Sequence, residues 1–441
     1  MPYTEIGRTE YKLTLIAEHA RKDKTMQFIS LAHLLSKDYL GRCFFSLSKK
    51  KAKGIDNVGY NEYLENLDDN LNLLVEKLKN KSFKPLPARR VYIPKDNGEK
   101  RPLGISAIEN KIVEKGIKNI LESIYEQDFS DQSYGFRPNR NCHQALKDIH
   151  NQFADNRINH IIEADIKGFF DNVSHEMLME FLKKRIKDSS MLYLINKFLK
   201  AGYVDAGLLV TSDEGTPQGS ILSPLLANVY LHYVLDEWFE NVVKSHTVGY
   251  CEFVRYADDF ICVVNLQKDA EDIERVLYKR FRKYGLELHP EKTGRISFGA
   301  FELLNAKTKD RKPNTFEFLG FTHYCDRGRK GGFKIGRKTS KKKFNKKCKD
   351  MTDWLKAIRN KVSMKEWWDT LKAKLRGHFE YYGVSENFLS IRAFYNHTLR
   401  ELKKWVNKRS QKKSMNWENF YKYLEIYPVP KPSIKHKFYN Y

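Results

Sequence analysis

The spacing of hydrophobic positions divides the chain into helical and strand-like stretches. Leucines recur at intervals of three and four between positions 60 and 78, which predicts an amphipathic helix there. Similar patterns predict helices in the first 50 residues, over 106–128, from about 176, over 225–231 and over 269–285. Short β-branched and aromatic runs predict strands over 88–95, 99–105, 160–166, 253–264, 286–289 and 316–321. Helices and strands are thus intermixed, which indicates an α+β protein.

Composition narrows the class of protein. The 441 residues are 41% hydrophobic, enough to fold into two or three domains with their own cores. The formal net charge of +24 favours a polyanionic partner, with nucleic acid ahead of an anionic membrane surface. We find neither a run of about 20 apolar residues nor a signal pattern at the N-terminus, so a cytoplasmic protein is expected. Six scattered cysteines lack a C-x-x-C pair and should be reduced structural thiols.

Two adjacent aspartates form the strongest candidate for chemistry. Asp258 and Asp259 lie between two apolar runs, at the tip of a predicted hairpin. Carboxylates this close repel each other unless a cation lies between them, and Mg²⁺ is a suitable cation. An exposed acidic turn is the alternative interpretation. Asp165 ends the strand predicted at 160–166, where it could be a metal ligand or a helix cap. Three converging carboxylates are what two-metal phosphoryl transfer requires.

Basic and glycine-rich segments surround these aspartates in the sequence. The predicted hairpin over 88–105 turns at Asn97-Gly98, and its arms carry cations that include Arg90, Lys95, Lys100 and Arg101, as a phosphate-gripping flap or an ordinary solvated hairpin would. The loop over 134–140 is suited to backbone contact and base stacking, or is a structural turn. Gln218 and Gly219 lie in a loop that lets the backbone approach a ligand. After 326–336 the composition becomes basic, and the spacing predicts amphipathic helices with basic outer faces.

Several motifs in a fixed order carry a family resemblance. They are Arg101-Pro102-Leu103-Gly104-Ile105, Tyr134-Gly135-Phe136-Arg137-Pro138, Asp165 with Phe169-Phe170-Asp171, Pro217-Gln218-Gly219, Tyr256-Ala257-Asp258-Asp259 and Phe318-Leu319-Gly320-Phe321. Together they resemble the reverse transcriptase/maturase proteins encoded by bacterial group II introns, over roughly residues 50–435. Ser220 and Ser106 depart from the pattern, since many relatives have glycine and proline there.

The resemblance implies a right-hand polymerase. A helical N-terminal extension (1–85) would precede fingers and a palm with an antiparallel sheet (86–326), and a basic helical thumb or maturase (X) domain would follow (327–441). It also implies two Mg²⁺ ions, or Mn²⁺ instead, as cofactors. The partners implied are an RNA template such as structured intron RNA, a DNA or RNA primer, dNTPs and target DNA. The chain would act as a monomer or a homodimer.

The resemblance also implies a role for individual residues. Asp165, Asp258 and Asp259 would be catalytic and would bind the metals with help from the Ile166 carbonyl, and Phe170 would exclude ribonucleotides. Nucleotide contacts would come from Lys95, Arg101, Gln218 and Lys292, and a primer grip from Phe318, Leu319, Gly320 and Phe321. The residues expected to bind nucleic acid are Arg137, Arg140, Lys341, Lys342, Lys346, Arg376 and Arg409.

Three functions remain open at this point. The chain could be an intron-encoded RNA-directed DNA polymerase that also assists splicing and retromobility. It could be a related polymerase outside any intron, serving phage defence, a CRISPR locus or DNA repair. It could also be a non-catalytic RNA-binding splicing factor, although an unused cluster of carboxylates is costly to retain. Since no Cys/His module follows the thumb, we expect no DNA endonuclease activity.

Overall fold

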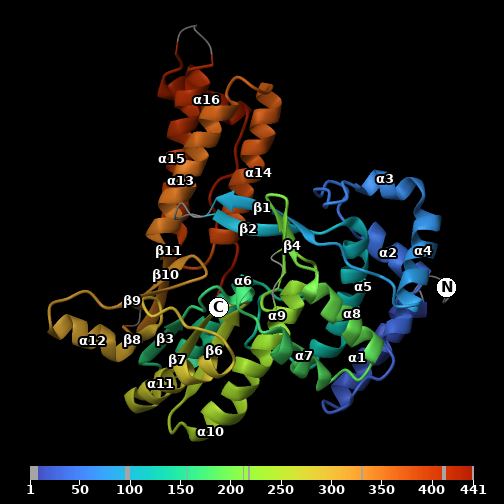
Figure 1. Ribbon diagram of the computed structural model, residues 1–441. Coiled ribbons are helices and arrows are strands. Elements are labelled where there is room, and N and C mark those ends of the chain that lie inside the picture. The colour runs from blue at the N-terminus through green and yellow to red at the C-terminus, as the bar shows by residue number, and fades with distance from the viewer. Residues whose placement is uncertain are drawn as a thin grey trace, which may run out of the picture.

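The computed structural model describes residues 8–94, 100–155, 157–211, 213–216, 219–328, 331–409 and 414–439. Helices α1 (Arg8–Lys22), α2 (Lys37–Phe45), α3 (Tyr60–Glu65) and α4 (Leu67–Lys79) gather around the long, largely buried α5 (Ile108–Tyr125), on one side of the molecule (Figure 1). The single helix expected over 60–78 is two helices, because Asn66 leaves the helical region at φ −123° and ψ 39°.

The central sheet is fully antiparallel and has the order β6-β7-β3-β8. Its strands are β6 (Cys251–Tyr256), β7 (Asp259–Val264), β3 (His160–Ala164) and β8 (Gly294–Ser297). Alternate side chains enter two different cores: Ile162 packs with α11 (Gln267–Lys283) and the N-terminal helices, and Ile161 packs with α6 (Cys142–Asp155). Because both faces are covered, the strands read as continuous apolar runs. The segment 286–293 forms only an isolated bridge, between Leu288 and Ile166.

A second sheet has the order β2-β1-β4-β5 and lies between the N-terminal helices and the helical C-terminal region (Figure 1). The expected hairpin is confirmed as β1 (Ala88–Pro94) and β2 (Lys100–Ile105), and its turn is outside the described residues. β4 (Tyr203–Asp205) and β5 (Leu208–Val210) complete this sheet. Its neighbours in the chain are α7 (His175–Lys183), α8 (Ser189–Lys200) and α9 (Ser223–Leu231).

The third sheet corrects two expectations. The aromatic segment 316–321 is not one strand, because Leu319 (φ 50°) and Gly320 (φ 78°) form a turn between β9 (Thr315–Phe318) and β10 (Phe321–Arg327). The boundary expected near 326–336 falls inside a hairpin, since β10 pairs with β11 (Phe333–Thr339) along its whole length. The helical C-terminal region therefore begins at α13. It comprises α13 (Lys341–Ile358), α14 (Met364–Tyr382), α15 (Phe388–Asn407) and α16 (Trp417–Ile426).

Two further expectations can be compared with the fold. All six cysteines are free, and five of them are buried, as expected for structural thiols. Among the described residues, no helix has the length and apolar character that crossing a bilayer would demand.

Candidate active site

The three candidate carboxylates come together at one end of the central sheet. Asp258 lies in the two-residue turn between β6 and β7, and Asp259 is the first residue of β7. Ala257 enters this turn with φ 60°, a left-handed conformation uncommon outside glycine. Ala164 of β3 pairs with Phe260 of β7, so Asp165 and Asp259 take up the next opposed positions of the ladder. Opposed positions in an antiparallel ladder lie about 4.5–5.5 Å apart between Cα atoms.

The pKa shifts of Asp258 and Asp259 indicate that the three carboxylates act on one another. Loss of hydration raises the pKa of Asp258, and Asp165 raises it further, whereas Arg101 lowers it. The Asp259 side chain is exposed. Loss of hydration, together with the charges of Asp258 and Asp165, nevertheless raises its pKa to about 6. Lys292 and Lys343 act in the opposite direction on Asp259. A cation placed among the three oxygens would remove this repulsion.

A lysine is the nearest cation that the chain itself supplies. The Nζ atom of Lys292 lies 2.7 Å from Oδ2 of Asp165, and 60% of the lysine side chain is exposed. In the part of the chain that the structure describes, no three His, Cys, Asp or Glu groups already converge as a metal site. The donor set nevertheless fits Mg²⁺, since it offers carboxylate oxygens only and open space faces them.

A groove about 800 Å³ in volume leads to Asp259. Its walls are the β6–β7 hairpin, the Leu319–Gly320 turn, α13 and α14. Lysines of α13 and α14 line it: Lys343, Lys346, Lys347 and Lys374. A basic groove that ends at a cluster of carboxylates is suited to hold a polyanion with a reacting end at the carboxylates.

Comparison with known proteins decides the family. The family model described as "Reverse transcriptase (RNA-dependent DNA polymerase)" matches residues 93–323, just over half of the chain. The chain belongs to the reverse transcriptase family. The match begins in β1 and ends in β10, so it contains all three carboxylates.

Relatives place this reverse transcriptase with the group II intron type, as the sequence motifs predicted. It is 36% identical over 284 residues to "Protein YkfC" of Escherichia coli, covering 56% of this chain and 74% of the relative. It is 48% identical over 166 residues to "Group II intron-encoded protein LtrA" of Lactococcus lactis, covering 37% of this chain and 27% of the relative. An "Uncharacterized 91 kDa protein in cob intron" of Schizosaccharomyces pombe is 37% identical over 245 residues, 54% of this chain and 30% of that protein. The matches to these last two relatives thus span less than a third of their length.

The nucleotide side of the reverse transcriptase site is described in part. Arg101 of β2 is exposed and near enough to lower the pKa of Asp258. Lys95 and Gln218 lie outside the described residues. Phe170 belongs to a short 3₁₀ turn, η2 (Phe169–Asp171), and its ring meets Phe136 edge to face at 6.4 Å. Phe136 lies in the motif at 134–138 and has a left-handed φ of 60°, but the sequence did not indicate its contact with Phe170.

The predicted primer grip is a hairpin fastened to the helical C-terminal region. Phe318 and Phe321 are buried, and they pair across the turn. The Leu319 carbonyl accepts a hydrogen bond from the Tyr381 hydroxyl at 3.0 Å, and the Gly320 carbonyl accepts one from the Ser340 amide at 3.0 Å. The turn therefore faces the groove with its backbone orientation fixed.

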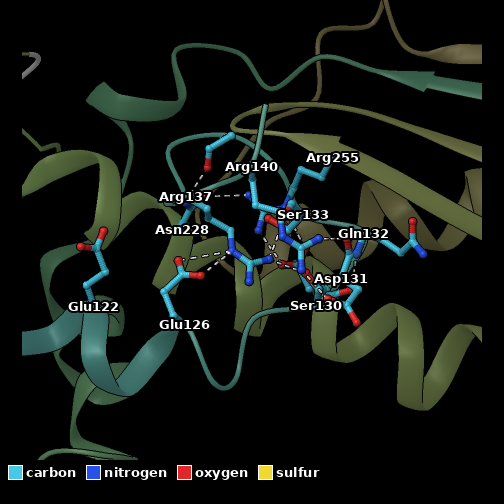
Figure 2. Close-up of polar contacts among 12 residues, drawn as sticks. Glu122, Glu126, Ser130, Asp131, Gln132, Ser133, Arg137, Arg140, Asn228 and Arg255 are labelled. Carbon is cyan, nitrogen blue, oxygen red and sulfur yellow. Dashed lines mark hydrogen bonds and ion pairs between the residues drawn. The ribbon is translucent and has the colours of Figure 1, made fainter. Parts of the chain in front are cut away.

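Two of the arginines expected to bind nucleic acid are structural. Arg137 is 7% exposed, and its guanidinium is bound to Glu126 and to the carbonyls of Ser130 and Ser133 (Figure 2). These bonds occupy Nε and Nη1 of Arg137, and contact of this residue with nucleic acid stays a prediction. Arg409 donates to the carbonyls of Arg359 and Val362 and so ties together the segment between α13 and α14.

The other candidate cations keep exposed surface. Arg140 is partly exposed and pairs with Asp131 at the same time. Lys341, Lys342 and Arg376 are exposed on α13 and α14, and Lys342 lines the space beside Asp165. Lys346 pairs loosely with Asp350 at 3.8 Å and faces the groove. These residues stay predictions for nucleic-acid contact.

A buried glutamate is a further feature that the sequence did not indicate. Glu114 of α5 is 3% exposed, and its Oε2 accepts the Ile221 amide hydrogen at 2.8 Å. Its Oε1 accepts the Ser106 hydroxyl hydrogen at 3.2 Å, and the Ser220 hydroxyl bonds to the same carboxyl group. The two departures from the family pattern, Ser106 and Ser220, therefore share one partner. Only this coincidence in the sequence could have led to Glu114.

Proposed function

We propose that this reverse transcriptase extends a primer on an RNA template at Asp165, Asp258 and Asp259, which would hold two Mg²⁺ ions with the Ile166 carbonyl. Bound there, the metals would lower the pKa of the primer 3′-hydroxyl and neutralise the triphosphate. The observation that carries this proposal is that Asp165 and Asp258 both act on Asp259 as nearby like charges, and that Asp259 lines a groove walled by lysines.

The chain's own residues would position the reactants. Lys292 would leave Asp165 when the metals enter and, being mostly exposed, could turn toward the leaving phosphate. Arg101 would bind the triphosphate from β2. The backbone of Leu319 and Gly320 would support the primer end, and the lysines of α13 and α14 would hold the duplex backbone.

Phe170 would act as the steric gate of the nucleotide site. Its ring would occupy the space of a ribose 2′-hydroxyl, held there by the edge of Phe136. Phe170→Ala should therefore admit ribonucleotides, measured as the ratio of kcat/KM for a dNTP and the matching NTP. An unchanged ratio would remove Phe170 from this role.

The catalytic test compares two aspartate variants. Asp258→Ala should lower primer extension with Mg²⁺ and dNTPs by about 10³-fold or more, since metal-assisted charge stabilisation is worth several kcal/mol. Its affinity for template RNA should stay near the wild-type value. Asp353→Ala, an exposed change on α13, should leave extension unaltered. A large loss of RNA affinity in Asp258→Ala, with a proportionate loss of extension, would count against the catalytic assignment and favour a non-catalytic RNA-binding factor.

For its biological setting, we propose that the protein is encoded by a group II intron and also binds intron RNA to assist splicing and retromobility. Two observations support this role: the 48% identity to LtrA, and the basic faces of α13 and α14. The test is whether the flanking DNA folds as an intron and whether that RNA splices faster with the protein added. Unchanged splicing with intact polymerase activity would favour a polymerase outside introns.

A further inference from the structure

A buried ion pair lies directly behind the catalytic turn. Arg255 is the last residue but one of β6, and Asp236 ends η3 (His232–Asp236), which continues α9 as a π-helix. Both side chains are fully buried. Nε of Arg255 donates to Oδ1 of Asp236 at 2.8 Å, and Nη2 of Arg255 donates to the other carboxylate oxygen. The pair is bidentate, which fixes the plane of the guanidinium.

The remaining guanidinium nitrogen reaches the catalytic turn itself. Nη1 of Arg255 donates to the carbonyl of Ala257 and to Oδ1 of Asn228, both at 3.0 Å. Ala257 is the left-handed residue that directly precedes Asp258. A carbonyl held from behind fixes the peptide plane between Ala257 and Asp258, and with it the direction in which the Asp258 side chain leaves the backbone.

A second contact closes the turn from the other side. The side-chain Nδ2 of Asn228 donates to the Gly135 carbonyl at 2.8 Å. A Cβ atom on Gly135 would lie 2.3 Å from the backbone nitrogen of Ala257, so only a glycine here lets the two backbones approach this closely. The segment also pairs with β6, since the Tyr134 amide donates to the Arg255 carbonyl at 2.9 Å. Arg137 holds this segment from within (Figure 2).

The π-helix explains how Asn228 and Asp236 reach one guanidinium. Residues eight apart on an α-helix differ by about 80° in direction, at about 100° per residue. The i→i+5 bonding of a π-helix accommodates one extra residue and reduces that offset to about 20°. Asn228 on α9 and Asp236 at the end of the π segment can then face Arg255 together.

We infer that Arg255, Asp236 and Asn228 are positioning residues that preset the Ala257–Asp258 turn for metal binding. This inference rests on the proposed metal site and assigns to it residues that do not contact the metals. These three residues would hold the turn in its metal-binding conformation before the metals bind. Without them, metal binding itself would have to order the turn. Mutation of groups one contact removed from metal ligands typically lowers metal affinity by about 10- to 100-fold.

A matched ion pair elsewhere in the chain provides the control. Arg185 and Asp128 are also buried, with side chains 3% and 7% exposed and a separation of 2.9 Å. Arg185 donates to carbonyls near the end of α1, among them Lys24 and Ala20. Asp128→Asn therefore causes the same kind of damage to a buried pair without touching the catalytic turn.

The experiment measures Mn²⁺ binding to the full chain without nucleic acid, from the loss of the free-ion signal in electron paramagnetic resonance. Asp236→Asn should weaken Mn²⁺ binding by about 10-fold or more, and Asp128→Asn should leave it at the wild-type value. The Mg²⁺ concentration for half-maximal primer extension should shift in the same way. If Asp236→Asn fails to fold by circular dichroism, Asn228→Ala decides, because it leaves the Arg255–Asp236 pair intact and should produce a smaller loss in the same direction.

The outcomes separate this inference from the function it rests on. Wild-type Mn²⁺ affinity in folded Asp236→Asn or in Asn228→Ala overturns the positioning role. An equal loss in Asp128→Asn also overturns it, because general softening of the fold would then be the cause. If Asp258→Ala binds Mn²⁺ as the wild type does, the proposed metal site fails, and the inference fails with it.

Discussion

Replacing the buried Glu114 with glutamine should change how stability depends on pH. Burial raises the pKa of Glu114 to about 7 from an ordinary value of 4.5, against the opposing hydrogen bonds from Ile221, Ser220 and Ser106. The folded chain therefore holds this proton more tightly than the unfolded chain does. The stabilisation is fully present below about pH 4.5 and is lost as the pH rises through about 7.

The magnitude follows from the size of the shift. A difference of about 2.5 pKa units at about 1.4 kcal/mol each corresponds to roughly 3–4 kcal/mol in the free energy of unfolding, of which about 2.5 kcal/mol falls between pH 5 and pH 8. Glutamine cannot ionise, and it can still accept from the Ile221 amide and donate to the Ser106 oxygen. As the pH rises over this interval, the free energy of unfolding of Glu114→Gln should therefore increase by about 2.5 kcal/mol relative to that of the wild type.

Urea unfolding of both proteins at the two pH values measures this gain. The comparison cancels the contributions of other titrating groups, which both proteins share. Glu65→Gln, an exposed change on α3, should leave the difference between the two pH values unchanged. Parallel pH profiles for wild type and Glu114→Gln would show that the buried carboxyl group is not protonated in the folded protein, and would refute the reasoning.

Two other changes test the cleft. Lys292→Gln should move the acid limb of the pH–rate profile for primer extension to higher pH, because the Lys292 charge lowers the pKa of Asp259 and its removal raises that pKa above about 6; an unmoved limb would exclude this coupling. Gly377→Ala should stabilise α14 by about 0.5–1 kcal/mol, since nothing lies within 4 Å of the added Cβ. Gly377 lines the groove, so the same change should weaken primer–template binding; a higher melting temperature with unaltered affinity would place the duplex elsewhere.

The groove explains how one chain can combine binding and chemistry. The lysines of α13 and α14 face the same space as Asp259, and the turn at Leu319 and Gly320 connects the two walls. A hydrogen bond from Tyr381 holds that turn to α14. Nucleic acid held along the lysines would thus be placed relative to the carboxylates by backbone contacts, without base-specific readout.

Local sequence patterns predicted many of the elements and the turn that carries Asp258, but not the helix break at Asn66 or the turn at Leu319 and Gly320. Apolar runs on either side of Asp258 and Asp259 predict the hairpin that the structure has, because alternation and turn position are properties of neighbouring residues. The strand before Asp165 was found in the same way. The ordered motifs then identified the family, since several matches in sequence are far more specific than one.

Tertiary structure alone decided what the charged side chains do. Arg137 and Arg255 look like cations available to phosphate, but carbonyls and carboxylates from distant segments surround them. Glu114 looks like an ordinary surface residue of an amphipathic helix, but the chain near Ile221 folds over it. The role of a charged group depends on which groups bury it and which form hydrogen bonds with it. Those groups come from distant parts of the chain, which no local sequence pattern connects. The sequence therefore determined where the carboxylates of the active site lie, and the fold determined which of the surrounding charges serve structure and which remain free to bind.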